Sequence, residues 1–263
     1  MDIGRIRTLI EKEWAEVFKN RLVLFTVAFL PLVFTALPLG VLYATRNAGG
    51  SGDLADMPPQ FLQLCGDLSG SDCLQMFITQ QFLLMFMMMP LIIPVSIAAY
   101  SIVGEKTTRS LEPLLATPIT TLELLAGKGL AAAVPAVLAT WLAFGLFALG
   151  APLVGGGPAV VRLLTSPVWL LAVFVAGPLM SVMSVSFAIM VSSRANDPRV
   201  AEQMAAVIIV PLLATLFAQL AGVIVLNLGF MLAAIAVLVI VDALLLPLGA
   251  RLFEREAILT RWK

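Results

Sequence analysis

The sequence predicts an all-α integral membrane protein with six transmembrane helices. Of its 263 residues, 60% are hydrophobic and only 12% are charged, whereas a soluble domain carries about 25% charged residues. Six apolar runs are each long enough to cross a bilayer, which takes about 20 helical residues. These runs are continuous and rich in Leu, Ala and Val, whereas the strands of a β-barrel would give short segments of alternating hydrophobicity.

The first predicted element is an amphipathic helix over residues 3–19. Its apolar residues recur every three or four positions with charged residues between them, which is typical of a helix lying along a membrane surface. A simple helical lead-in to the first span would show the same periodicity. The apolar positions are Ile3, Ile6, Ile10, Trp14, Val17 and Phe18.

The six predicted spans then follow in order, joined by segments that are mostly short. They cover about residues 22–44, 79–103, 128–150, 167–192, 204–226 and 229–250. The connection between the fifth and sixth spans is expected to be a tight turn centred on residues 227–229. An even number of spans places both termini on the same side of the membrane.

The Lys and Arg residues are divided unequally between the two sides of these spans. Fourteen of the sixteen lie on the side of the termini, and only Arg46 and Arg162 lie on the other. Cytoplasmic segments of membrane proteins carry the excess of Lys and Arg. We therefore expect a multi-pass protein of the plasma or inner membrane, with both termini and the segment after Gly104 in the cytoplasm.

The longest segment between spans is the predicted external loop over residues 45–78. It contains both cysteines of the chain, Cys65 and Cys73. Because this loop lies on the oxidising side, a disulfide between them is plausible, and two free thiols are the alternative. A metal site is not expected, because the chain has no His and two cysteines do not complete a zinc shell.

Motifs for nucleotide hydrolysis and for nucleophilic catalysis are absent from the sequence. Gly127-Lys128 is followed by Gly129, and Leu122 stands where a phosphate-binding loop needs its first glycine. The absence of His excludes His-dependent catalysis, and no Gly-x-Ser-x-Gly elbow occurs. We therefore expect no catalytic residues and no bound cofactor in this chain.

The polar segment 104–118 between the second and third spans is the most informative part of the chain. On a helix, Glu105, Arg109 and Glu112 would share one face. Leu111, Leu114 and Leu115 would form an apolar side, and two prolines in the segment limit any helix to short pieces. This pattern suits a docking surface for a soluble partner, and an ordinary solvated turn is the alternative.

The sequence of this segment resembles the cytoplasmic loop of ABC-2-type permeases, the membrane subunits of ATP-binding cassette transporters. The resemblance rests on residues 104–106 and 110–118 and extends to the tail at 251–259. With the six-span count, it covers essentially the whole chain. In this family the loop lies against a separate ATPase. The resemblance therefore implies that the coupling residues are Gly104, Glu105, Lys106, Arg109, Leu111, Glu112, Leu114 and Leu115.

The resemblance further implies an exporter in which two permease subunits, identical or paralogous, form the path in membrane lipid. ATP and Mg²⁺ would be bound by the cytoplasmic ATPase subunits, and no nucleic acid is expected as a partner. The short external loops favour the sodium- or drug-efflux subgroup. Some relatives have two re-entrant half-helices between the last two spans, but the 49 residues from Glu202 to Ala250 leave too few for such a pair.

Inside the spans, Asp242 is the only acidic residue, and such a residue is a functional candidate by default. A protonated or hydrogen-bonded structural Asp is the alternative. Ser181 and Ser184 of the fourth span, interleaved with methionines, could line a path for an apolar substrate or could simply allow close helix packing. The rival function is a self-sufficient secondary carrier in which Asp242 binds a proton or cation.

Overall fold

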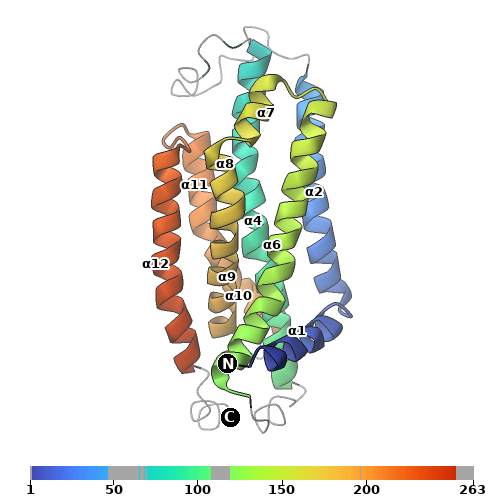
Figure 1. The fold of residues 1–263 in the computed structure, drawn as a ribbon, viewed down its shortest axis with the longest axis vertical. Coiled ribbons are helices and arrows are strands. Elements are labelled where there is room, and N and C mark those ends of the chain that lie inside the picture. The colour runs from blue at the N-terminus through green and yellow to red at the C-terminus, as the bar shows by residue number, and fades with distance from the viewer. Residues whose placement is uncertain are drawn as a thin grey trace.

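The computed structural model describes residues 2–46, 65, 68, 70–107, 119–195 and 197–252, and every regular element in these ranges is helical (Figure 1). Six helical segments there are long and apolar enough to cross a membrane, as the sequence predicts. The first three spans are single helices, α2 (Arg21–Thr45), α4 (Gly70–Thr107) and α6 (Thr121–Leu153).

The fourth and fifth spans are each built from several helical pieces. The fourth consists of α7 (Pro158–Leu164), α8 (Pro167–Leu171), the π-helical turn η1 (Ala172–Ala176) and α9 (Gly177–Ser192). The fifth consists of α10 (Pro198–Ala205), the 3₁₀ turn η2 (Ala206–Ile209) and α11 (Val210–Leu220), and the sixth is α12 (Leu228–Leu252).

Helices α4 and α9 form the centre of the bundle, and the other spans pack around them. Four aromatic side chains fill the core between α4, α6 and α8. The ring centroids of Phe86 and Phe147 lie 5.3 Å apart, and those of Phe144 and Trp169 lie 5.8 Å apart. Each such pair contributes about 0.5–1.5 kcal/mol beyond its buried area.

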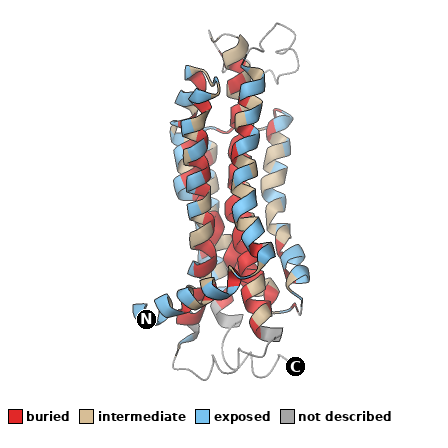
Figure 2. Cartoon of the chain, turned by 90° about the vertical axis from the view of Figure 1, so that its right-hand side faces the viewer, coloured by how far each residue is buried: buried red, intermediate tan, exposed pale blue. Residues whose placement is uncertain are grey.

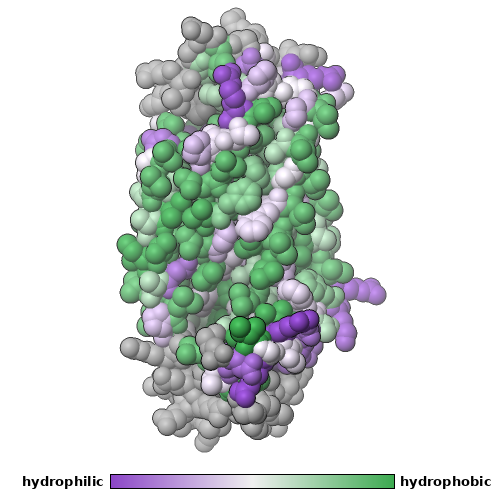
Figure 3. Space-filling model, viewed as in Figure 1, coloured by the Kyte–Doolittle hydropathy of each residue, from purple (hydrophilic) through white to green (hydrophobic). Residues whose placement is uncertain are grey.

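The outer faces of α2, α6, α11 and α12 carry exposed Leu, Val and Phe side chains. They form a broad apolar band, and the polar surface is concentrated toward the two ends of the molecule (Figure 3). In water such a band would be a large exposed hydrophobic patch. It is the surface expected of a protein that lipid or a second subunit covers.

Helix α1 (Ile3–Val17) does not continue the bundle but lies across one end of it (Figure 2). The carboxylate of Asp2 caps it by accepting a hydrogen bond from the Gly4 amide at 2.9 Å. Helix α1 packs mainly on α6 and also touches α4. We call this end of the molecule, formed by α1, the C-terminal end of α4 and the N-terminal end of α6, the base.

Helix α4 begins at Gly70, well before the predicted start of the second span near residue 79. The added turns contain polar residues, which led the sequence interpretation to place them in the loop. Of these, Ser71 and Asp72 are half-buried and Gln75 is buried. The side-chain Nε2 of Gln75 donates to the backbone carbonyl of Gly155 at 3.2 Å, and its Oε1 accepts from the backbone amide of Gly157 at 3.1 Å. Tertiary hydrogen bonds therefore extend this helix.

The fifth span ends at Leu220, and the predicted end at 226 and tight turn at 227–229 were wrong. Gly222 has φ +70°, a left-handed conformation that ends helices and that glycine adopts without strain. Residues 223–226 are apolar, so hydropathy continued past the true end of the helix. The connection over residues 221–227 contains no helix.

Candidate coupling site at the base

Helix α1 is held tightly against α6 at the base. Gly127 of α6 faces Leu9, which is buried, and a Cβ atom at position 127 would lie 2.5 Å from Leu9 Cδ2 and 3.2 Å from Leu9 Cβ. The Trp14 indole N–H donates to the Ala131 carbonyl one turn further along α6, at 2.9 Å. A glycine and a tryptophan hydrogen bond therefore fix both the distance and the register of the two helices.

Next to this contact lies a cluster of buried charges that joins α1, α4 and α6. Lys128 Nζ is 2.7 Å from Glu13 Oε1 of α1 and 2.8 Å from Glu105 Oε2 of α4, and all three side chains are less than 5% exposed. Lys128 Nζ also contacts Ser101 Oγ at 2.9 Å, and Lys12 Nζ donates to Glu105 Oε1 at 2.7 Å. We call these five residues the basal ion-pair cluster.

The basal ion-pair cluster is electrically balanced, with two carboxylates and two ammonium groups. The Ser101 hydroxyl donates to Glu13 Oε2 at 2.5 Å, so both Glu13 oxygens have partners. Burial would lower the pKa of Lys12, but the hydrogen bond and charge of Glu105 outweigh it and raise that pKa. Because a buried ion pair stabilises a structure only while every member has a partner, the cluster behaves as one unit.

A second polar contact ties the start of α1 to the start of α6. Glu123 Oε1 accepts from the Asp2 amide at 2.7 Å, and Glu123 Oε2 lies 3.8 Å from Arg5. Glu123 also completes a capping box with Thr120, in which each side chain accepts from the other's backbone amide. The first turn of α6, directly after the segment 108–118, is therefore anchored to α1.

The structure describes only part of the predicted coupling segment. Gly104 and Glu105 lie in the last turns of α4. The Lys106 side chain and the whole of Arg109, Leu111, Glu112, Leu114 and Leu115 lie outside the described residues. Glu105 differs from expectation, because it is 4% exposed and bound by two lysines rather than standing on a solvated face.

The predicted intramembrane residues are all buried. Asp242 is 6% exposed and lies on the inward face of α12, the helix that packs against α9. Neither of its carboxylate oxygens has a hydrogen-bond partner among the described residues. The Ser184 hydroxyl donates to the Leu91 carbonyl at 2.6 Å and thereby joins α9 to α4, whereas the buried Ser181 hydroxyl has no partner in the described part of the chain.

Sequence reasoning missed a group of buried amides between α4 and α11. The Gln219 side chain donates to the Gln80 carbonyl and the Gln80 side chain donates to the Leu226 carbonyl, both at 3.4 Å. Both polar atoms of the Gln81 side chain are buried without a partner in the described structure. The signal was Thr79-Gln80-Gln81, three polar residues at the predicted start of the second span, to which the sequence interpretation gave no role.

Sequence reasoning also gave no role to Glu13, and it considered Lys128 only in the charge count and in the search for a phosphate-binding loop. At the opposite end of the molecule, a disulfide joins Cys65 to Cys73 in the first turn of α4. Within the described ranges, no group of three His, Cys, Asp or Glu side chains could hold a metal ion.

Comparison with known proteins places this architecture in a family. No curated protein matches the chain. The sequence model of the family described as "ABC-2 family transporter protein" matches residues 7–235, which is most of the 263 residues. The match begins within α1 and includes the base and all of the first five spans. The chain therefore belongs to the ABC-2 family of transporter membrane proteins.

Proposed function

We propose that this chain is the permease subunit of an ATP-driven exporter in which two permease subunits form the path. A separate cytoplasmic ATPase binds ATP and Mg²⁺ and docks on the base. Its motion enters through the segment 104–118 and through α1. The base therefore faces the cytoplasm, in agreement with the excess of Lys and Arg among the residues at that end.

The observation that carries this proposal is the basal ion-pair cluster. The segment 108–118 connects the end of α4 to the start of α6, and Lys128 joins those two helices to each other and to α1. A push on this segment or on α1 is therefore delivered to the same three helices. A docked ATPase needs a rigid contact of this kind, because a flexible loop would move with the ATPase without moving the spans.

The path itself is assigned to the faces that the single chain leaves uncovered. Helices α2, α11 and α12 expose apolar side chains along most of their length. A second permease subunit covers part of this surface, and lipid covers the rest.

The proposal is tested by affinity purification of the tagged chain from its native membranes in mild detergent. We expect an ATPase with a phosphate-binding loop to copurify with the wild type. Glu112→Arg reverses a charge in the coupling segment and should abolish its recovery. Arg162→Glu is the matched control, because it reverses a charge on α7 at the far end of the molecule and should leave recovery unchanged.

If Glu112→Arg recovers the ATPase at the wild-type level, the docking surface does not include the coupling segment at this residue. Absence of any ATPase from a folded wild-type preparation would contradict the proposed assembly. Glu105→Arg is avoided as a probe, because that side chain lies inside the basal ion-pair cluster and its reversal would disturb folding.

A second candidate function is favoured by Asp242, whose buried carboxylate lacks a partner in the described structure. In a secondary carrier this group would bind a proton or cation during transport. That function predicts transport by the chain alone, driven by an ion gradient and abolished by Asp242→Asn. A chain whose transport needs the ATPase and survives Asp242→Asn rules the carrier out.

A further inference from the structure

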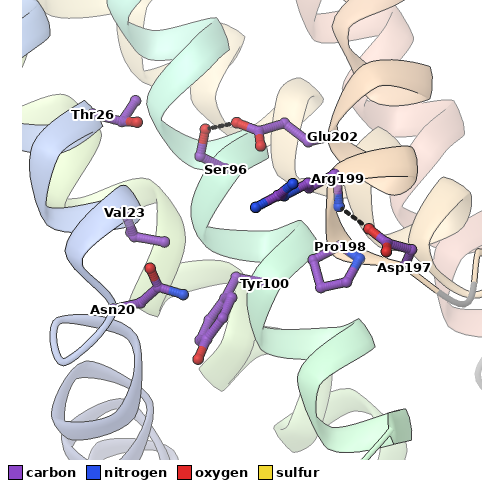
Figure 4. Close-up of a pocket in the computed structure, with 9 residues that line it drawn as sticks. All are labelled: Asn20, Val23, Thr26, Ser96, Tyr100, Asp197, Pro198, Arg199 and Glu202. Atoms are coloured by element: carbon purple, nitrogen blue, oxygen red, sulfur yellow. Dashed lines mark hydrogen bonds between the residues drawn. The ribbon is translucent and has the colours of Figure 1, made fainter.

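A cavity of about 400 Å³ with several polar and charged residues in its wall lies between α2, α4 and α10, toward the same end of the molecule as the base (Figure 4). Helices α2 and α10 both pack on α4, and the cavity occupies the space between them. Its floor is α4, which contributes the buried Ser96 and the half-buried Tyr100. The α2 side contributes Asn20, Val23 and Thr26.

The α10 wall of this cavity presents one cation and two carboxylates. Arg199 extends its guanidinium toward α4, between Ser96 and Tyr100 (Figure 4). No ion pair or side-chain hydrogen bond occupies that guanidinium among the described residues, although Glu202 lies one turn away. Instead, Glu202 accepts a hydrogen bond from the Ser96 hydroxyl.

The second carboxylate, that of Asp197, is engaged by the helix. Its Oδ1 accepts from the Arg199 amide at 2.7 Å and caps the N-terminus of α10. The cavity therefore offers the exposed Arg199 guanidinium, which has no partner among the described residues, and, on the same wall, the exposed Glu202 carboxylate, which the buried Ser96 binds. A ligand that fits these groups carries a negative and a positive charge a few bonds apart.

The cavity continues sideways into a more open space of about 430 Å³. This second space shares Thr26, Arg199 and Glu202 with the first and is also lined by Phe25 and Ala206. Phe25 is 59% exposed and stacks on Phe29, with ring centroids 4.5 Å apart. The cavity near the base thus opens onto the apolar outer surface of α2, the surface that acyl chains would contact in a membrane.

We propose that this cavity binds the headgroup of a phospholipid that carries a phosphate and a primary ammonium group. Arg199 pairs with the phosphate, for which a guanidinium is well suited. Glu202 accepts hydrogen bonds from the ammonium, and the acyl chains leave past Phe25. A quaternary ammonium is disfavoured, because it donates no hydrogen bond and, among the described residues that line the cavity, only Tyr100 is aromatic.

This site goes beyond the proposed function and does not depend on it. It requires only that the chain lies in a membrane, and it is tested on the chain without an ATPase. Failure of the lipid site therefore leaves the transporter proposal intact, and failure of ATPase docking leaves the lipid site intact.

The test measures lipid binding to the purified, delipidated full-length chain by native mass spectrometry. The probes are dioleoyl-phosphatidylethanolamine, the matching phosphatidylcholine and the matching phosphatidylglycerol. We expect phosphatidylethanolamine to bind more tightly than either of the others by on the order of tenfold, the effect of a charge-assisted hydrogen bond. This comparison uses only the wild type, so it does not depend on any variant folding.

Variants then test whether Arg199 binds the phosphate and Glu202 binds the ammonium group. Arg199→Gln and Glu202→Gln should each weaken binding of phosphatidylethanolamine by on the order of tenfold. Glu202→Gln should also remove the preference over phosphatidylglycerol, and Arg199→Lys should restore part of the affinity. Arg162→Gln, an exposed arginine at the other end of the molecule, is the matched control and should bind like the wild type.

Four results would overturn the proposal. They are equal binding of phosphatidylethanolamine and phosphatidylcholine, wild-type binding by both Gln variants, equally tight binding of water-soluble glycerophosphoethanolamine, and a change of subunit number in the Gln variants without a change in lipid binding. The third would assign the cavity to a soluble zwitterion. The fourth would assign it to a second copy of the chain.

Discussion

At the base, a single side chain, that of Lys128, joins α1, α4 and α6. It is 3% exposed and touches two carboxylates from helices that are far apart in the sequence. In a low-dielectric interior, removal of Lys128 leaves Glu13 charged without a cation and leaves Glu105 with Lys12 alone. At the residue scale, the structure therefore predicts that these charges depend strongly on one another.

Lys128→Met should destabilise the chain by about 3–5 kcal/mol, because Glu13 and Glu105 then lose their shared cation. The double variant Glu13→Gln/Lys128→Met removes one charge of each sign and leaves Glu105 paired with Lys12, so it should cost much less. Thermal unfolding of the detergent-solubilised protein measures both. The exposed pair Arg7–Glu11 gives the control, because Arg7→Gln should change stability by less than about 1 kcal/mol.

A double variant that is no more stable than Lys128→Met would contradict this dependence. Additive effects would mean that Glu13 and Lys128 contribute separately.

At the element scale, α1 matters through its contact with α6 more than through its amphipathic pattern. The sequence predicted this helix correctly from its apolar spacing. It could not predict that a charged residue, Glu13, would be buried on the same face as Leu9 and Val17, because its partner Lys128 is 115 positions away in the sequence. The distance between α1 and α6 is set by Gly127, whose role no local pattern in the sequence reveals.

Gly127→Ala should push α1 away from α6, because the new Cβ would lie too close to Cδ2, Cγ and Cβ of Leu9. A change of the Leu9 rotamer cannot relieve the contact with the Leu9 Cβ. Overpacking of this kind typically costs 1–3 kcal/mol. Gly145→Ala is the matched control on the same helix, since a Cβ there meets no atom within 4 Å. A lower unfolding midpoint for Gly127→Ala alone is expected, and equal midpoints would show that α1 is not tightly docked.

At the scale of the whole molecule, the arrangement of six spans was largely predictable, whereas the details within spans were not. Hydropathy located every span, because each contains a long apolar run. It failed at Gln75, which looks like a loop residue until its hydrogen bonds across the bundle are known, and at Leu220, where a glycine two residues later ends the helix while the sequence stays apolar.

The orientation in the membrane is a second prediction at this scale. In a background with Cys65 and Cys73 replaced by Ser, Glu11→Cys on α1 should react with a membrane-impermeant maleimide only after the cells are permeabilised. Arg162→Cys on α7 should react in intact cells, because that end should face outward. The reverse labelling pattern would show that the base faces outward, and it would exclude a cytoplasmic ATPase docked on the base.

The central claim is that the basal ion-pair cluster transmits the motion of a bound ATPase to the spans. ATP hydrolysis by the assembly purified in lipid tests it most directly, with Glu13→Gln/Lys128→Met compared to the wild type. We predict that the ATPase still copurifies but that its hydrolysis rate changes on the order of tenfold, because α1 is no longer joined to α6 through Lys128. A folded variant that binds the ATPase and hydrolyses ATP at the wild-type rate would contradict the claim.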